Sequence, residues 1–203
     1  MAFEVRKLTP EDDRSRFHSG NADLDRFFAR YAGQNQFRHH IGTTYVAVDP
    51  EGVIAGFVTV CASEIVPDSM PASRRKRLPR YPVPVLRLAR LAVGEGRKGQ
   101  GVGSLLLRAV FVLAARMAGD MGCVGLVVDA KPDAVRFYEK LGFMALEVVA
   151  GELGDRPLPL PMFLEPDRHG FASWSSSRNI GSGSGRSPSS PATTSSAMKP
   201  SFS

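Results

Sequence analysis

The sequence predicts an α/β protein built on one mixed sheet of six or seven strands flanked by about four helices. Two β-rich runs joined by a turn occupy residues Thr43–Cys61, which indicates antiparallel pairing early in the chain. Further on, a strand-like run at Val85–Val93, a helical pattern at Gly103–Met117 and a second apolar run at Cys123–Val128 follow one another. Strand, helix and strand in that order predict a parallel pair within the same sheet.

The chain begins with one strand and one amphipathic helix. Phe3–Leu8 is expected to be the first strand, and the helix is expected at Asn21–Tyr31 with Asn21 as its N-cap. Its apolar stripe is predicted from residues at i, i+3, i+4 and i+7, namely Leu24, Phe27, Phe28 and Tyr31.

A hairpin and the strand Val85–Val93 are expected next. Thr43–Val48 and Val53–Cys61 are rich in β-branched residues, and the intervening Asp-Pro-Glu-Gly has the composition of a hairpin turn. A basic connection with several prolines, Pro67 to Pro84, leads into Val85–Val93.

The second half is predicted to complete the sheet. The helix Gly103–Met117 leads to a buried strand at Cys123–Val128. Pro132 is expected to open a short helix that Gly142 closes, since proline favours the first turn of a helix and glycine the position after its end. Apolar runs at Met144–Val149 and Leu158–Leu164 supply the last strands.

Composition favours a soluble, cytoplasmic protein. The chain is 43% hydrophobic, contains no run of eighteen apolar residues, and does not begin like a signal peptide. Cys61 and Cys123 each lie in an apolar run, which favours buried thiols over a disulfide or a catalytic pair. The four histidines have no metal-ligand spacing, so no metal site is expected.

Two regions are predicted, a folded domain at residues 1–167 and a disordered tail at 168–203. Thirteen of the thirty-one residues from Ser173 to Ser203 are serine, and a GSGSG run lies among them. Such a composition cannot bury a core. The tail is interpreted as a solvated segment, with assistance to polyanion binding as the alternative.

Positive charge is concentrated in one segment. The net charge is +6, and residues 70–94 contain seven basic side chains and no acid. Such a run creates a local positive surface that suits a nucleic acid, although a solvated surface without a partner is the alternative. The seven are Arg74, Arg75, Lys76, Arg77, Arg80, Arg87 and Arg90.

A glycine-rich loop between the predicted strand and helix points to a pyrophosphate ligand. Its sequence from Arg97 to Leu105 is RKGQGVGSL. Bare glycine backbone and the N-terminus of the following helix present unpaired N–H groups to an anion, although such a run can also be a simple turn. The pattern is neither GxxxxGK[ST] nor GxGxxG. It resembles motif A of the GNAT acyltransferase superfamily, with Lys98, Gly101 and Gly103 at the motif positions.

That resemblance implies acetyl-CoA as co-substrate, bound by this loop and by the strand before it. The pantetheine arm is expected along the backbone of Leu91, Ala92 and Val93. The pyrophosphate is expected at Gly99, Gly101, Gly103 and Ser104.

A second GNAT signature, A-x-x-[FL]-Y-x-x-x-G-F, is matched from Ala134 to Phe143. By resemblance, its tyrosine, Tyr138, is the general acid that protonates the departing thiolate. A phenol with a pKa of about 10 can donate a proton without prior ionisation. Packing in the core is the alternative role for this tyrosine.

No carboxylate general base is visible, because Val85–Val93 carries no acid. A lysine amine with a pKa of about 10.4 needs such a base more than an α-amine near 7.7–8.0 does. The sequence therefore favours an α-amine as acceptor.

Residues 3–166 resemble the TacT-type toxins of bacterial toxin–antitoxin pairs. The resemblance rests on HSGNADLDRFF at His18–Phe28, GQNQ at Gly33–Gln36, TTYV at Thr43–Val46, the run Arg87–Val93 and PLPMFL at Pro159–Leu164. It implies an N-acetyltransferase that modifies the α-amine of aminoacyl-tRNA and blocks translation, with a ribbon-helix-helix antitoxin as partner and a homodimeric assembly. The seven basic residues are then candidates for binding the acceptor stem, or in part the antitoxin.

Two alternatives remain from the sequence. One is a GNAT enzyme acting on a protein N-terminus or a small-molecule amine, and the other is a module that binds acyl-CoA or an antitoxin without catalysis. Asn35 and Gln36 are equally open, as helix caps or as substrate contacts.

Overall fold

The computed structural model describes residues 2–70, 72–146 and 159–165. It confirms the predicted mixed sheet, which has seven strands in the order β1-β2-β3-β4-β5-β7-β6. The strands are β1 (Glu4–Lys7), β2 (Thr43–Val48), β3 (Ile54–Ile65), β4 (Val83–Val93), β5 (Leu126–Ala130), β6 (Met144–Ala145) and β7 (Leu160–Leu164). The predicted tail lies outside the described residues, as does the second half of the run Met144–Val149.

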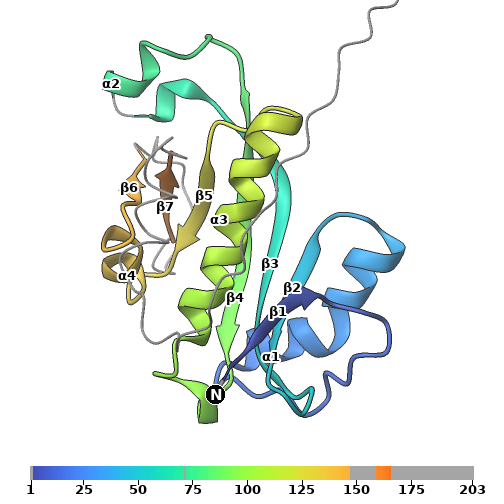
Figure 1. The fold of residues 1–203 in the computed structure, drawn as a ribbon. Helices are drawn as coiled ribbons and strands as arrows, with labels where there is room; N and C mark the ends of the chain where they lie inside the picture. Colours follow the sequence, from blue (N-terminus) through green and yellow to red (C-terminus); the bar gives the residue numbers. More distant parts are fainter. Residues whose placement is uncertain (1, 71, 147–158, 166–203) are drawn as a thin grey trace, which may run out of the picture.

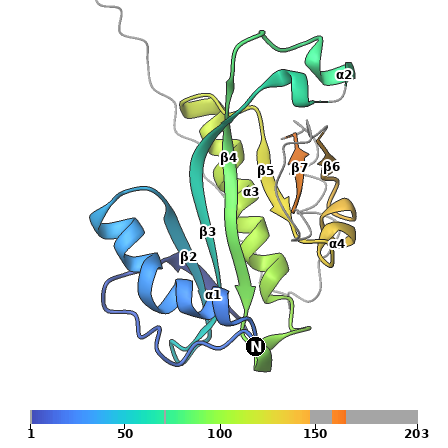
Figure 2. The same ribbon diagram turned by 180° about the vertical axis from the view of Figure 1, so that it is seen from behind.

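Pairing is antiparallel from β1 to β4 and parallel between β4 and β5, as expected. The helix α3 (Val102–Asp120) makes the crossover between the two parallel strands. It lies across one face of the sheet, while α1 (Ala22–Arg26) and the turns after it lie on the other face (Figures 1 and 2).

The largest core cluster lies between α3 and the sheet. Leu106, Leu107 and Val110 of α3 pack there with Val58 of β3 and Leu88 of β4. By length and composition α3 could cross a membrane, with a mean hydropathy of 1.6. Its place over the sheet accounts for those apolar residues, because a helix that forms the central core of an α/β layer must be apolar on its inner side.

Two smaller core clusters lie on the opposite face of the sheet. One joins Phe28 and Phe57 beneath α1, with the two rings stacked 4.3 Å apart between centroids. The other, around Met70 and Val85, lies beneath the 3₁₀ turn Pro67–Ser69 and α2 (Ala72–Arg75).

The predicted helix Asn21–Tyr31 differs from the observed one. Asn21 is the N-cap, and its side chain accepts hydrogen bonds from the backbone N–H groups of Asp23 and Leu24. After α1 the chain continues as π-helical turns at Phe27–Tyr31 and Gln34–Arg38. The wider turns shift later side chains away from the 3.6-residue stripe, so Tyr31 is 46% exposed instead of buried.

Several boundaries also differ from those expected. β3 runs on to Ile65 because β4 pairs with it along almost its whole length. β5 begins at Leu126, later than the predicted Cys123, although Val124 and Gly125 already form backbone hydrogen bonds with Pro84 and Leu86 of β4. The short helix α4 occupies only Val135–Glu139, and Gly142 after it has φ +90°. Both cysteines are free, and Cys123 is buried, whereas Cys61 is half-buried instead of buried, on a sheet face that no core cluster covers there.

Candidate active site

The strands β4 and β5 diverge in the middle of the sheet. Their parallel pairing covers only Leu86–Leu88 of β4 against Leu126–Val128 of β5, although β4 continues to Val93. A β-bulge lies at the same point, since Leu88 pairs with Val60 and Arg90 with Thr59, which leaves Ala89 as the extra residue. Bulges bend a strand and increase its twist. We call this divergence the fork (Figures 1 and 2).

The predicted cofactor-binding residues of β4 lie along the fork. Leu91 and Val93 are half-buried and Ala92 is buried. Their backbone is paired with β3 on one side and has no β5 partner on the other. A strand edge with unpaired N–H and C=O groups can bind an extended amide chain such as pantetheine.

The glycine loop and the start of α3 form a concentration of free backbone donors. Gly101 is the N-cap of α3 with φ +82°, and no side chain caps this end of the helix. A Cβ added at Gly99 or Gly101 would meet nothing within 4 Å. Val102, Gly103 and Ser104 form the first helical turn, whose N–H groups have no partner within the helix. This backbone fits the phosphates of coenzyme A.

The loop is anchored to the β2–β3 hairpin by an ion pair that the sequence did not reveal. Arg97 Nη2 lies 2.5 Å from Asp49 Oδ2, and the Asp49 side chain is only 2% exposed. Asp49 Oδ1 also accepts the backbone N–H of Val53. The two partners are 48 residues apart, so no local pattern could predict the contact. Lys98 is exposed, and its Nζ lies 3.9 Å from Glu95 Oε1.

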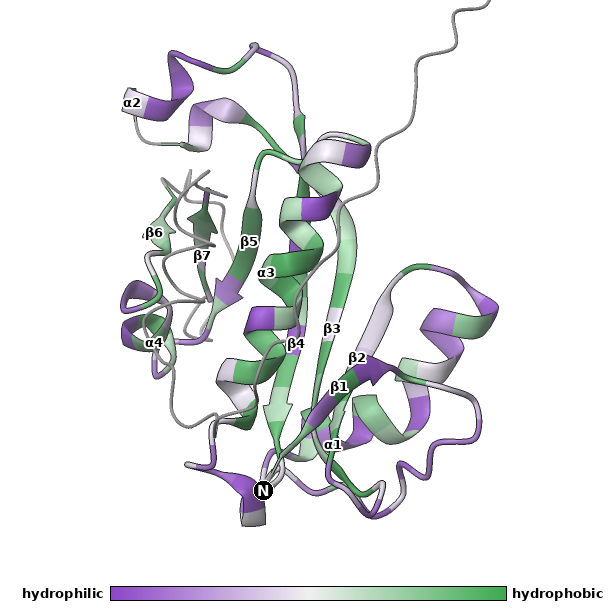
Figure 3. Cartoon of the chain, in the orientation of Figure 1, coloured by the Kyte–Doolittle hydropathy of each residue, from purple (hydrophilic) through white to green (hydrophobic). Residues whose placement is uncertain are grey.

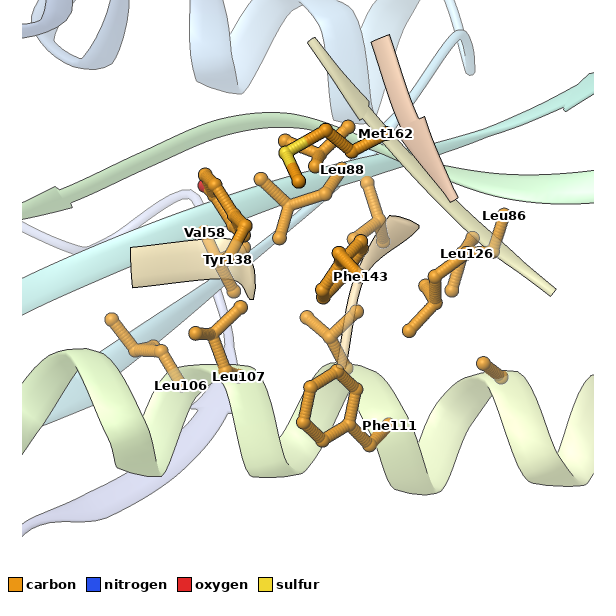
Figure 4. Packing of buried hydrophobic residues seen from close by; sticks show 14 of the residues in the cluster. Val58, Leu86, Leu88, Leu106, Leu107, Phe111, Leu126, Tyr138, Phe143 and Met162 are labelled. Atoms are coloured by element: carbon orange, nitrogen blue, oxygen red, sulfur yellow. The ribbon is translucent and has the colours of Figure 1, made fainter. Parts of the chain in front are cut away.

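Tyr138 lies at the start of the fork on the α3 side. Its side chain is 6% exposed and packs in the main core cluster with Leu88, the last β4 residue paired with β5. Figure 4 shows its ring between Leu106, Leu107 and Met162, with the hydroxyl pointing away from Phe143. Within the described part of the chain, no hydrogen bond engages this hydroxyl.

Burial raises the pKa of Tyr138 to about 12. The phenol is therefore protonated at neutral pH, which suits a proton donor and not a base. Tyr138 is thus a core side chain, and its hydroxyl has no hydrogen-bond partner among the described residues, so the role of general acid stays a prediction.

The seven basic residues fall into two groups. Arg75, Lys76, Arg77 and Arg80 are exposed on and after α2, a hydrophilic region in Figure 3. The other three have internal partners. Arg74 forms an ion pair with Glu165 after β7, Arg87 forms one with Asp129 of β5, and Arg90 lies over the Phe27 ring, 5.3 Å from its centroid.

Gln36 is neither a helix cap nor an exposed side chain for a substrate. Its Nε2 donates to the backbone oxygen of Leu8, and its Oε1 accepts the backbone N–H of Thr44. The side chain therefore joins the end of β1 to β2. Asn35 is half-buried, and its backbone oxygen accepts the N–H of Ile41.

A forked mixed sheet with a glycine loop after the fourth strand, whose free backbone donors suit a pyrophosphate, is typical of an acetyltransferase of the GNAT class. The model of the GNAT acetyltransferase domain matches residues 40–145. The chain belongs to this family and is an N-acetyltransferase by that membership.

Its relatives narrow the class further. A tRNA-acetylating toxin of Mycobacterium tuberculosis is 30% identical over 139 residues, which cover 68% of this chain and 82% of the relative. The solved structure of AtaT complexed with acetyl-methionyl-tRNAfMet is 26% identical with a TM-score of 0.70, covering 81% of this chain and 95% of the other. The AtaTR structure bound with AcCoA is 25% identical with a TM-score of 0.66, covering 86% and 98%.

Proposed function

We propose that this protein transfers the acetyl group of acetyl-CoA to the α-amine of aminoacyl-tRNA and so blocks translation. The observation that carries the proposal is the fork, which joins a free backbone edge, a glycine loop and a protonated tyrosine in one place. The relatives support the substrate class, because the mycobacterial protein is a tRNA-acetylating toxin and AtaT was solved in complex with acetyl-methionyl-tRNAfMet.

The geometry of the fork supports the following division of roles. Gly99, Gly101, Gly103 and Ser104 hold the pyrophosphate, with Lys98 beside them, and the backbone of Leu91, Ala92 and Val93 holds the pantetheine arm. Bound acetyl-CoA supplies the activated acetyl group. Tyr138 donates a proton to the thiolate that leaves, and its high pKa keeps that proton in place until the sulfur becomes basic enough to take it.

The exposed basic side chains after the 3₁₀ turn Pro67–Ser69 bind the phosphates of the tRNA. Arg75, Lys76, Arg77 and Arg80 are free to do so, because phosphate recognition needs exposed charge and tolerates varied geometry. Arg74 of α2 lies beside them and adds to the positive field, whereas Arg90 lies near the other end of β4, over the Phe27 ring. The basic residues at and after α2 lie beyond the N-terminal end of β4, at the opposite end of that strand from the glycine loop (Figure 1).

The similarity to the tRNA-acetylating toxins motivates three further proposals about location, assembly and inhibition. The enzyme acts in the bacterial cytoplasm, assembles as a homodimer, and is inhibited by a ribbon-helix-helix antitoxin. Residues 1–167 form the acetyltransferase domain, and residues 168–203 form a tail outside the reaction. A chain ending at residue 167 is then expected to retain activity, and light scattering of the full chain measures its assembly.

Transfer of labelled acetyl groups to charged tRNA tests the central proposal. Replacing Tyr138→Phe is expected to lower the rate by about 10²–10⁴ while leaving acetyl-CoA binding intact. Tyr45→Phe is the matched control, since Tyr45 is a half-buried tyrosine of β2 whose pKa burial also raises. Modification of free peptides or small amines, with none of aminoacyl-tRNA, would refute the proposal. An unchanged rate in Tyr138→Phe would remove the proposed acid.

A further inference from the structure

An arginine and an aspartate are joined at the base of the fork. Arg87 of β4 donates through Nη1 to Asp129 Oδ2 of β5, at 2.5 Å. Arg87 Nε also donates to Ser63 Oγ of β3, at 3.3 Å. Three adjacent strands therefore hold one carboxylate in place.

This pair lies where β4 and β5 separate. The last parallel pair is Leu88 with Val128, and Asp129 is the next residue of β5. Leu88 and Val128 both point into the core beneath α3. Because side chains alternate along a strand, Arg87 and Asp129 lie on the opposite face of the sheet.

On the α3 face, the surroundings of Tyr138 are apolar and so disfavour a charged acceptor amine. Tyr138, Leu106, Leu107 and Met162 fill this face with packed side chains (Figure 4). The acceptor is therefore expected to reach the fork from the other face, where Asp129 is. On that face the side chains of Arg87 and Asp129 are 31% and 45% exposed.

The chemistry of the pair suits an amine. Asp129 has a side chain that is 45% exposed, and its Oδ1 has no partner among the described residues. A carboxylate oxygen accepts hydrogen bonds from an α-amino group in either protonation state, and more strongly from the charged one. Arg87, engaged by Ser63 on one side and by Asp129 on the other, restricts the orientation of that carboxylate.

We propose that Asp129 binds the α-amino group of the acceptor and that Arg87 is its positioning residue, with no contact to tRNA phosphate. The inference rests on the proposed function, because it assigns the amine-binding group of that reaction. It also gives the acid-free strand β4 a carboxylate from its neighbour β5.

Binding of charged and deacylated tRNA separates the two roles. In the wild-type protein, aminoacyl-tRNA from a total tRNA pool is expected to bind more tightly than the same pool after deacylation. In Asp129→Asn that difference should disappear, and kcat/KM should fall about tenfold to hundredfold, as for loss of a charged hydrogen bond. The affinities for deacylated tRNA and acetyl-CoA should stay unchanged.

Arg87→Met should reproduce the Asp129→Asn loss, and the two changes together should cost little more than either alone. Arg87→Lys should restore part of the rate, since lysine keeps the positive charge but lacks the several N–H donors of a guanidinium. Asp120→Asn is the matched control, because Asp120 forms an exposed pair with Arg116 at the far end of α3. It should leave every value unchanged.

Two results would overturn the inference. One is an active wild-type enzyme whose Asp129→Asn and Asp129→Ala variants keep the preference for charged tRNA. The other is weaker binding of deacylated tRNA by Arg87→Met, with a smaller salt dependence, which would make Arg87 a phosphate ligand. A wild-type protein that acetylates no aminoacyl-tRNA would instead refute the proposed function and this inference with it.

Discussion

The two ends of α3 offer a direct test of the phosphate-binding loop. Gly101 at the N-terminus has φ +82° and Gly122 just past the C-terminus has φ +83°, and an added Cβ would meet no atom within 4 Å at either position. Left-handed backbone costs an L-residue roughly 1–2 kcal/mol. Gly101→Ala and Gly122→Ala should therefore lower the free energy of unfolding by the same amount, about 1–2 kcal/mol each.

Only Gly101→Ala should affect acetyl-CoA. Its methyl group would occupy the space that the pyrophosphate needs against the first turn of α3, and at least a tenfold loss of affinity is expected, which is about 1.4 kcal/mol. Urea unfolding measures the shared stability cost, and calorimetric titration with acetyl-CoA measures the difference. Equal affinities in the two variants would refute the assignment of this loop to the pyrophosphate.

Three further outcomes are expected. Asp49→Asn should lower the free energy of unfolding by about 2–3 kcal/mol, because it breaks an ion pair whose aspartate is buried. It should also weaken acetyl-CoA binding, whereas the control Glu51→Gln, at an exposed position, should do neither. Equal denaturation midpoints for the two variants would contradict this. Hydrogen bonds from Arg6 hold the pKa of Asp12 below its usual range, so their stabilisation is present above about pH 4 and lost as the pH falls through the lowered pKa. Asp12→Asn should thus be less stable than wild type in urea at pH 7 but not at pH 2, and a constant difference would be inconsistent with that linkage. Glutamine at the exposed basic positions should reduce the salt slope of tRNA binding by up to about 0.7–0.9 per residue, and an unchanged slope would remove these side chains from the interface. These positions are Arg75, Lys76, Arg77 and Arg80.

Local patterns predicted the elements well and the contacts between them poorly. The hairpin turn, the crossover helix and the Asn21 cap depend on residues close in sequence, and each is present. The tie between Asp49 and Arg97 and the pair of Arg87 with Asp129 join residues more than forty positions apart. The sequence alone shows that β4 contains no acid. The place of Asp129 of β5 beside Arg87 of β4 could be found only from the pairing of the two strands.

The π-helical turns after α1 show a different limit. The spacing of Leu24, Phe27, Phe28 and Tyr31 predicts a regular α-helix. In the structure the turn Phe27–Tyr31 is π-helical, and within it Phe28 stacks on Phe57 of β3. Tertiary contact here overrides the local period.

The bulge at Ala89 separates what the fold requires from what catalysis requires. Without this residue, Leu88 and Leu91 would still face α3, because a bulge places two residues opposite one without reversing the alternation beyond it. The hydrophobic interior would survive such a deletion, while the strand would lose the bend that parts it from its neighbour. A single residue outside the side-chain alternation thus bends β4 where it leaves β5, with little consequence for the packing under α3.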